Sequence, residues 1–199
     1  MTASTHMRIA MDSSTLLEPI GIGSRAPASE ALAFDDVYRA HFAFVWRAAK
    51  RLGVRDAALD DVVQEVFVVV HRRLASFEGR SSLRTWLFGI TARVVRDHRR
   101  AVKRKATNGD VDPDTLPSTP PPGAESAEAV RVLHQLLDAL DDERREVFVM
   151  AELEQMPVPE IADALGLNLN TAYSRLRLAR QDFEQALARH RARDEWRLR

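Results

Sequence analysis

The sequence predicts an all-α protein with two small helical domains joined by a flexible, Pro-rich acidic linker. Three observations support this fold class. Apolar residues recur at intervals of three and four in both halves, which is the period of an amphipathic helix. The stretch 107–128 contains five acidic residues, five of the nine prolines and no Lys or Arg. Cysteine is absent from all 199 residues, which excludes disulfide frameworks and thiolate metal sites.

The chain divides into four segments. Residues 1–33 mix Ser, Thr, Gly and Pro without a period and are predicted to be a flexible tail. Residues 34–106 and 129–199 are the predicted helical domains, and 107–128 is the linker. The N-terminus lacks the apolar stretch of a signal peptide, and apolar runs fall far short of the ~18 residues of a membrane span. We therefore expect a cytoplasmic protein without membrane insertion.

The first domain should begin with two helices. The first ends near Leu52, at Gly53, and the second is capped by Asp56. The apolar stripe of the first helix comprises Phe34, Val37, Tyr38, His41, Phe42 and Val45. The stripe of the second comprises Leu59, Val62, Val63, Val66, Phe67, Val70 and Leu74. The periodicity predicts a helix here although β-branched residues favour a strand.

A third helix should follow the turn-forming stretch 76–82, with Ser81 or Ser82 as its N-cap. Its inward face comprises Leu83, Trp86, Leu87, Ile90 and Val94. We expect Trp86 to belong to the core rather than to stack on a base. The opposite face is basic and comprises Arg96, Arg99, Arg100 and Lys103.

The second domain should open with a helix whose stripe is Val130, Leu133, Leu136, Leu137 and Leu140, followed by one that includes Val147, Phe148, Met150 and Ala151. A short helix is then predicted from near Pro159, and a sharp turn at Gly166 leads into a longer helix capped by Asn170 or Thr171. The longer helix should bury Ala172, Leu176, Ala179 and Phe183. This spacing is typical of a helix-turn-helix.

The outward face of the longer helix carries residue types that suit a DNA major groove. Arg can pair with guanine edges and Asn or Gln with adenine, whereas Ser and Tyr more often hold phosphates. The candidate DNA-binding residues of this half are Asn170, Thr171, Tyr173, Ser174, Arg175, Arg177, Arg180 and Gln181. A plain helical hairpin with a solvated polar face is the alternative.

The charge distribution also indicates a nucleic-acid partner. The whole chain has no net charge, but residues 34–106 hold 16 basic and 8 acidic residues, a net charge of +8. The linker 107–128 carries −5. Such asymmetry is expected when one part of a chain faces a polyanion, and the basic flank of the third helix provides the best candidates for phosphate contacts.

Signatures of catalysis are missing from the sequence. The six His residues are isolated, and there is no HExxH pair, phosphate-binding loop or nucleophile elbow. Asp60, Asp61 and Glu65 could in principle hold a metal, but carboxylates at a helix start more often interact with its dipole. We expect neither an enzyme nor a cofactor.

Both halves resemble the sigma-70 family of RNA polymerase sigma factors, of the extracytoplasmic-function type. Residues 60–67 match the core-binding helix of sigma region 2, and residues 83–87 match its Trp-Leu segment. Residues 174–176 with Ala179 and Arg180 match the recognition helix of region 4. That helix begins Asn168-Leu169-Asn170 where the family often has Pro-x-Gly, so promoter preference cannot be transferred.

The resemblance implies a dissociable subunit of bacterial RNA polymerase without chemistry of its own. The residues implied to bind core polymerase are Asp61, Gln64, Glu65, Val68 and Arg72. The segment from Phe77 to Thr85 would hold an extruded base of the minus-10 element, which adds Phe77, Arg80, Ser82 and Arg84 to the basic flank as DNA-binding candidates. Region 4 would read the minus-35 element. Many relatives are held inactive by an anti-sigma factor, which is a further partner to expect.

Two alternatives remain open from the sequence. A stand-alone helix-turn-helix regulator would bind DNA without polymerase, with the first domain used for dimerisation or sensing. A docking protein would use its helices only as surfaces for a partner.

Overall fold

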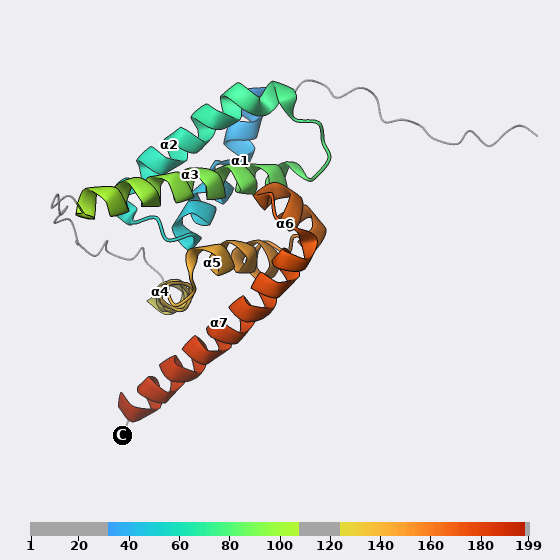
Figure 1. The fold of residues 1–199 in the computed structure, drawn as a ribbon. Coiled ribbons are helices and arrows are strands. Elements are labelled where there is room, and N and C mark those ends of the chain that lie inside the picture. Colours follow the sequence, from blue (N-terminus) through green and yellow to red (C-terminus); the bar gives the residue numbers. More distant parts are fainter. Residues whose placement is uncertain (1–31, 108–123, 198–199) are drawn as a thin grey trace, which may run out of the picture. The chain divides into compact units, whose positions relative to one another are not determined.

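The structure, a computed structural model, describes residues 32–107 and 124–197. Every regular element in these ranges is helical and none is a strand, which confirms the predicted all-α class (Figure 1). None of these helices is long and apolar enough to cross a membrane. Residues 1–31 of the tail predicted at 1–33, and residues 108–123 of the linker predicted at 107–128, lie outside the described residues.

The first half consists of α1 (Phe34–Arg51), α2 (Asp56–Arg73), a 3-10 turn η1 (Leu74–Ser76) and α3 (Leu83–Thr107). Each of the three long helices packs against the other two. Their shared core includes Val45, Val66 and Phe88, which are completely buried. The chain leaves α1 through Gly53, whose φ of +86° is a left-handed conformation that favours glycine.

The caps of the first half agree with the sequence only in part. Ser82 caps α3, because its Oγ accepts a hydrogen bond from the backbone N–H of Thr85 at 3.1 Å. The predicted Asp56 cap is wrong: Asp56 is the first residue of α2, and Arg55 occupies the N-cap position without a side-chain bond. The Asp56 carboxylate lies 2.9 Å from Lys50 Nζ, at the end of α1.

The predicted stripe of α1 is also partly wrong. Val37 and Val45 are buried, but Tyr38 and Phe42 are 40% and 38% exposed. Phe44 takes the inward position instead. The two exposed rings lie at the edge of the buried face and contact Phe67 of α2, with centroid distances of 4.7 and 6.1 Å. They therefore line a surface groove rather than the core.

The second half consists of α4 (Ala124–Leu137), α5 (Asp142–Phe148), a π-helical turn η2 (Val149–Leu153), α6 (Val158–Leu165) and α7 (Leu169–Arg197). Helix α4 begins five residues before the predicted boundary at 129, because Ala and Glu residues that favour helix follow Gly123 directly. Val130, expected on its inward stripe, is 50% exposed. Asp141 caps α5 by accepting from the Arg144 backbone N–H at 2.9 Å.

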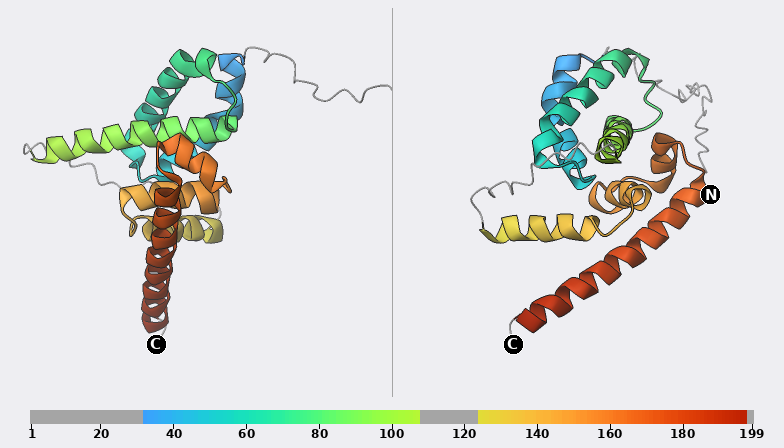
Figure 2. Two further views of the ribbon diagram at one scale, coloured as in Figure 1. Left: turned by 45° about the vertical axis from the view of Figure 1, so that its right-hand side comes forward. Right: turned by 60° about the vertical axis from the view of Figure 1, so that its left-hand side comes forward.

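The predicted helix-turn-helix is present as α6 and α7. Gly166 ends α6 with a φ of +66°, and Pro159 lies in the first turn, where its missing N–H costs nothing. Ala172, Leu176 and Ala179 are buried as expected, and Phe183 stacks on Phe148 at 4.7 Å. The C-terminal part of α7 projects beyond the other helices of this half (Figure 2).

The cap of α7 differs from the prediction. Helix α7 begins at Leu169, and Asn168 Oδ1 accepts from the Asn170 backbone N–H at 2.9 Å. Asn170 and Thr171 therefore lie inside the first turn, and Asn168 is the cap. Asn is among the most favourable N-cap residues. Asn168 directly precedes the first residue of α7, so its side chain can accept from a backbone N–H of the first turn.

Candidate nucleic-acid and polymerase interface

The outward face of α7 is available to a ligand. Asn170, Thr171, Ser174, Arg177 and Gln181 are all exposed. Tyr173 lies beside them, with 51% of its surface exposed. The buried residues Ala172, Leu176 and Ala179 fix the opposite side of the helix to the domain. The arrangement presents hydrogen-bonding side chains on one helical face, as reading base edges in a major groove requires.

Two of the candidate arginines on α7 are engaged within their own half. Arg175 is half-buried, and its Nη2 lies 2.5 Å from Glu143 Oε2 on α5. Arg180 is exposed, and its Nη2 lies 2.7 Å from Glu152 Oε1 on η2. Arg177 has no such partner among the described contacts, so it is the arginine best placed to pair with a base.

The five residues expected to bind core polymerase lie together on the exposed side of α2. Asp61, Gln64, Glu65, Val68 and Arg72 are all exposed, and Val68 is an apolar side chain with 42% of its surface in solvent. They follow the i, i+3, i+4, i+7 spacing of one helical face. The face combines charged groups with apolar area, which is typical of a protein-binding surface.

An open groove of about 690 Å³ borders this face between α1 and α2. Gln64, Val68 and Arg72 lie on one wall, and the half-exposed rings of Tyr38 and Phe42 lie on the other. The groove therefore extends the predicted polymerase-binding face onto α1, an extension that the sequence stripe had assigned to the core.

The minus-10 candidates lie along α3 and the loop before it. Phe77 packs on Trp86 with a centroid distance of 5.1 Å, and Trp86 itself packs against the core, as expected. Arg80 is exposed and forms an ion pair with Glu78. Arg100 is exposed, with its Nη1 3.8 Å from Asp97 Oδ1.

The other minus-10 candidates meet carboxylates from the second half of the chain. Arg84 Nη2 lies 2.5 Å from Glu154 Oε2, and its guanidinium lies over the ring of Phe44 at 4.6 Å. Arg96 Nε is 3.0 Å from Glu146 Oε1. Arg99 Nη1 and Lys103 Nζ are 2.5 and 3.9 Å from Asp142.

The loop residue Ser82 is held in the same way. Its backbone N–H donates to Glu160 Oε2 at 3.4 Å, and the same oxygen accepts from the buried hydroxyl of Thr85 at 2.8 Å. Glu160 belongs to α6, the first helix of the helix-turn-helix. The end of the predicted base-binding segment is thus in contact with the domain expected to read the minus-35 element.

Glu146 is a buried acid with a raised pKa. Its side chain is 6% exposed, and burial raises its pKa to about 7, against the lowering effect of Arg96 and Arg99. Although Arg96 Nε lies 3.0 Å from Glu146 Oε1, Arg96 Nε and Arg145 Nε are buried side-chain nitrogens without a hydrogen-bond partner in the described part of the chain. Burial likewise lowers the pKa of Arg145.

No group of three or more His, Cys, Asp or Glu residues capable of holding a metal occurs among residues 32–107 and 124–197. Sequence reasoning missed the four acids that face the first half: Asp142, Glu146, Glu154 and Glu160. The charge balance of the two halves could have indicated these contacts, because residues 129–199 hold 13 acidic residues and residues 34–106 have a net charge of +8.

Comparisons with known protein families match both halves of the chain in order. Residues 37–105 match the model of sigma-70 region 2, and residues 131–183 match that of sigma-70, region 4. Together they cover 69 and 53 residues, more than half of the 199.

Similar proteins carry names from the same family. The RNA polymerase sigma factor CnrH of Cupriavidus metallidurans is 30% identical over 169 residues, covering 80% of this chain and 88% of that protein. The ECF RNA polymerase sigma factor SigL of Mycobacterium tuberculosis is 31% identical over 159 residues, covering 78% of this chain and 89% of SigL.

Two solved structures share the fold. CnrH in complex with the cytosolic domain of CnrY has a TM-score of 0.58 and 28% sequence identity, covering 78% of this chain and 87% of that chain. The sigma factor RpoE in complex with the anti-sigma factor NepR from Bartonella quintana has a TM-score of 0.67 at 21% identity, covering 78% of this chain and 96% of that chain.

Proposed function

The chain belongs to the sigma-70 family of RNA polymerase sigma factors, in its extracytoplasmic-function type, and from that premise we propose how its residues divide the work of promoter recognition. The protein directs core RNA polymerase to promoters. Residues 34–106 serve as region 2 and residues 129–199 as region 4. Both act in the cytoplasm, where bacterial polymerase transcribes.

We assign polymerase binding to the exposed face of α2 and its groove. Asp61, Gln64, Glu65 and Arg72 supply charge and hydrogen bonds, and Val68 supplies apolar contact area. The unusual exposure of Val68, Tyr38 and Phe42 supports this assignment, because exposed apolar side chains gathered beside one groove mark interaction sites.

We assign the minus-35 element to α7. Asn170, Ser174, Arg177 and Gln181 face the duplex, Tyr173 and Thr171 flank them, and Arg175 and Arg180 reach phosphates when released from Glu143 and Glu152. The observation that carries the assignment is the helix-turn-helix geometry. Gly166 turns the chain between α6 and α7, and because Ala172 and Ala179 are buried, the polar face of α7 points outward.

We assign the minus-10 element to the segment 77–85 and to the basic flank of α3. Phe77, Arg80, Ser82 and Arg84 surround the predicted site of an extruded base, a step that costs a few kcal/mol of unstacking. Arg96, Arg99, Arg100 and Lys103 hold phosphates. An anti-sigma factor is the protein partner we propose, since the similar fold of RpoE is seen with one.

Transcription from fragmented host genomic DNA tests the function directly. Purified core polymerase is incubated with and without this protein, and the new 5′ ends are sequenced. New starts that share two upstream elements are the expected result. Co-elution with core is measured on the same sample, and absence of both starts and co-elution would overturn the proposal in favour of a stand-alone DNA-binding regulator.

A further inference from the structure

Two large side chains with apolar surface are exposed at the start of α7. Leu169 is 43% exposed and Tyr173 is 51% exposed. They lie four positions apart and therefore on the same side of the helix. Leu165 and Leu167, which precede them in the chain, pack against the core, so the leucines around this turn have different environments. The function proposed for α7 uses Tyr173 and gives no role to Leu169.

The turn before α7 fixes the position of Leu169. It is the first residue of the helix, and Asn168 directly before it accepts from the backbone N–H of Asn170 at 2.9 Å. Gly166, with a φ of +66°, turns the chain from α6 into α7. Because a capped first turn has a defined backbone, the Leu169 side chain leaves the helix in one direction.

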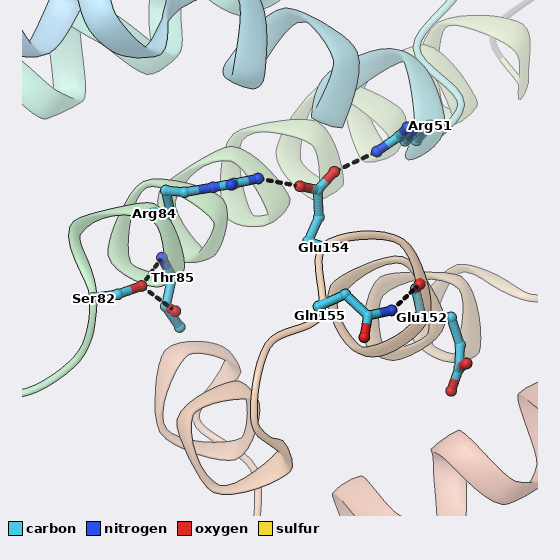
Figure 3. A network of polar contacts seen from close by, with 7 residues as sticks. All are labelled: Arg51, Ser82, Arg84, Thr85, Glu152, Glu154 and Gln155. Atoms are coloured by element: carbon cyan, nitrogen blue, oxygen red, sulfur yellow. Dashed lines mark hydrogen bonds and ion pairs between the residues drawn. The ribbon is translucent and has the colours of Figure 1, made fainter.

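Contacts farther along α7 fix the rotation of the helix about its axis. Arg180 follows Leu169 by eleven positions, which is about three turns, so both lie on the same side. Arg180 Nη2 lies 2.7 Å from Glu152 Oε1 on η2. Figure 3 shows the end of η2, where the Gln155 side chain donates to the backbone carbonyl of Glu152 at 2.7 Å. The far part of this side of α7 thus contacts η2, while its first turns stay exposed.

An apolar side chain at the start of a recognition helix suits one group of the DNA major groove. The N-terminal residues of such a helix contact base edges. These edges present hydrogen-bond donors and acceptors and one apolar group, the C5-methyl of thymine. Leu169 cannot pair with a donor or an acceptor, and covering such a group without a partner is unfavourable. The thymine methyl is therefore the group that Leu169 can cover without leaving a polar group unpaired.

We propose that Leu169 is a specificity-determining residue of the minus-35 interface: its side chain packs on the C5-methyl of one thymine in the duplex that α7 reads. Tyr173, one turn farther along, shields this contact from water. Asn170 and Ser174 read neighbouring base edges by hydrogen bonds. The inference rests on the proposed role of α7 in minus-35 recognition, and it adds a residue and the base that this residue selects.

Selection of DNA by the protein bound to core polymerase locates the thymine. The complex selects from a pool of duplexes of random sequence, and the bound duplexes are sequenced. Each thymine of the enriched upstream element is then replaced singly by deoxyuridine, which removes the methyl group and keeps every hydrogen-bonding group. At the thymine that Leu169 contacts, affinity should fall about fourfold, the value of one buried methyl group.

Leu169→Ala tests whether this side chain reads the methyl group. The variant should bind the thymine and deoxyuridine duplexes equally, because the contact that distinguishes them is gone. Its unfolding temperature should stay close to that of the wild type, since Leu169 is exposed and alanine favours helix. A ratio of affinities that is the same in the wild type and in Leu169→Ala would overturn the proposal.

Leu32→Ala is the matched control. It is the same substitution at a leucine with a similar exposed fraction, 45%, that precedes α1. We expect it to keep the thymine-to-deoxyuridine ratio of the wild type. If Leu169→Ala instead weakens binding equally on both duplexes, the Leu169 side chain contacts something other than the methyl group, such as the polymerase, and the proposal is refuted.

Leu169→Gln tests the same position by a change of specificity. Gln can form two hydrogen bonds to the edge of adenine. The same selection with this variant should therefore enrich a different base pair at this one position and the wild-type sequence elsewhere. Selection of the unchanged wild-type element would show that residue 169 does not read a base.

The selection also separates this inference from the proposed function. An enriched element in which no thymine methyl affects binding refutes methyl reading and leaves the role of α7 in place. Absence of any enriched element, together with absence of transcription starts, refutes the proposed function and the inference that rests on it.

Discussion

Glu146 and Glu143 are three positions apart, yet Glu146 is buried while Glu143 is an exposed partner of Arg175. Burial raises the pKa of Glu146 to about 7 although Arg96 lies 3.0 Å away. Desolvation of the carboxylate outweighs the attraction of a cation in this contact.

The raised pKa of Glu146 predicts a pH-dependent stability. An acid whose pKa is about 7 folded and 4.5 unfolded binds more protons in the folded state between these values. Stability is therefore lost as pH rises from 4.5 to 7, by about 3 kcal/mol in total. The charges that face Glu146 are Arg96, Arg99, Asp142 and Arg175.

Comparison with Glu146→Gln isolates this effect, because other titrating groups contribute equally to both proteins. Urea unfolding at pH 5 and pH 7.5 should show the wild type losing stability relative to the variant as pH rises. Parallel pH dependences would show that Glu146 titrates normally.

Arg177 is predicted to read a base. Arg177→Ala should reduce minus-35-dependent transcription by an amount that depends on the upstream sequence, with a loss of about 1–3 kcal/mol at the preferred base pair. Arg189→Ala is the control, as it removes an exposed arginine farther along the same helix. An equal loss on every upstream sequence would make Arg177 a phosphate contact instead.

At the scale of elements, α2 and α7 each have one side packed in the core and one side exposed to solvent. Helix α2 buries Val62, Val66 and Val70 and exposes Val68, and α7 buries Ala172 and exposes Ser174. The buried side fixes the orientation of the helix, so the exposed side is presented in a defined register.

Val68 is expected to contribute to polymerase binding through apolar contact. Val68→Asp should weaken co-elution with core polymerase at least tenfold, because a charge would be buried at the interface. Val102→Asp is the matched control: Val102 on α3 is 44% exposed, close to the 42% of Val68. Equal weakening by both variants would contradict a specific role for the α2 face.

The identity of the α7 cap can be tested by replacing Asn168 and Asn170 separately and comparing the stability of the two variants. Asn168→Ala should lower the free energy of unfolding by about 1 kcal/mol, since the Asn170 amide would lose its partner. Asn170→Ala should leave stability nearly unchanged and affect only DNA binding. Thermal or urea unfolding of both variants measures the difference, and equal losses would restore Asn170 as a capping residue.

At the scale of the whole molecule, charge is segregated along the chain. Residues 34–106 carry +8, the linker 107–128 carries −5, and residues 129–199 carry −2. Glu154, Glu146 and Asp142 of the second half lie beside Arg51, Arg96 and Arg99 of the first half, so acids of one half neutralise cations of the other.

We expect the acidic linker to run through the exit path of the polymerase, where its carboxylates would mimic the charge of a nucleic-acid strand. Replacing Asp110, Asp112 and Asp114 with Ser should then alter the ratio of abortive to full-length transcripts while leaving the start sites unchanged. The measurement is gel analysis of transcripts from one promoter. Unchanged abortive and productive patterns would argue against strand mimicry.

The sequence by itself determined the helical class, the helix-turn-helix and the family. Those features rest on local information: the period of apolar residues, Gly166 at a left-handed turn, and motif residues such as 60–67 within one helix. The sequence did not determine the capping residues of the helices, because several polar side chains lie close to each helix end. Asp56 lies beside Lys50 and is not the N-cap of α2, and Asn168 rather than Asn170 caps α7.

Only the tertiary structure decided what the charged residues contact. Helical periodicity places Arg96 and Arg99 on an outward flank of α3, but it cannot reveal that Glu146 and Asp142 meet them there. Ion pairs of this kind join residues about fifty positions apart in the chain, and Arg51 and Glu154 are 103 apart. Sequence patterns report which side of a helix is polar, whereas the partner of a polar side chain is set by how the two halves pack.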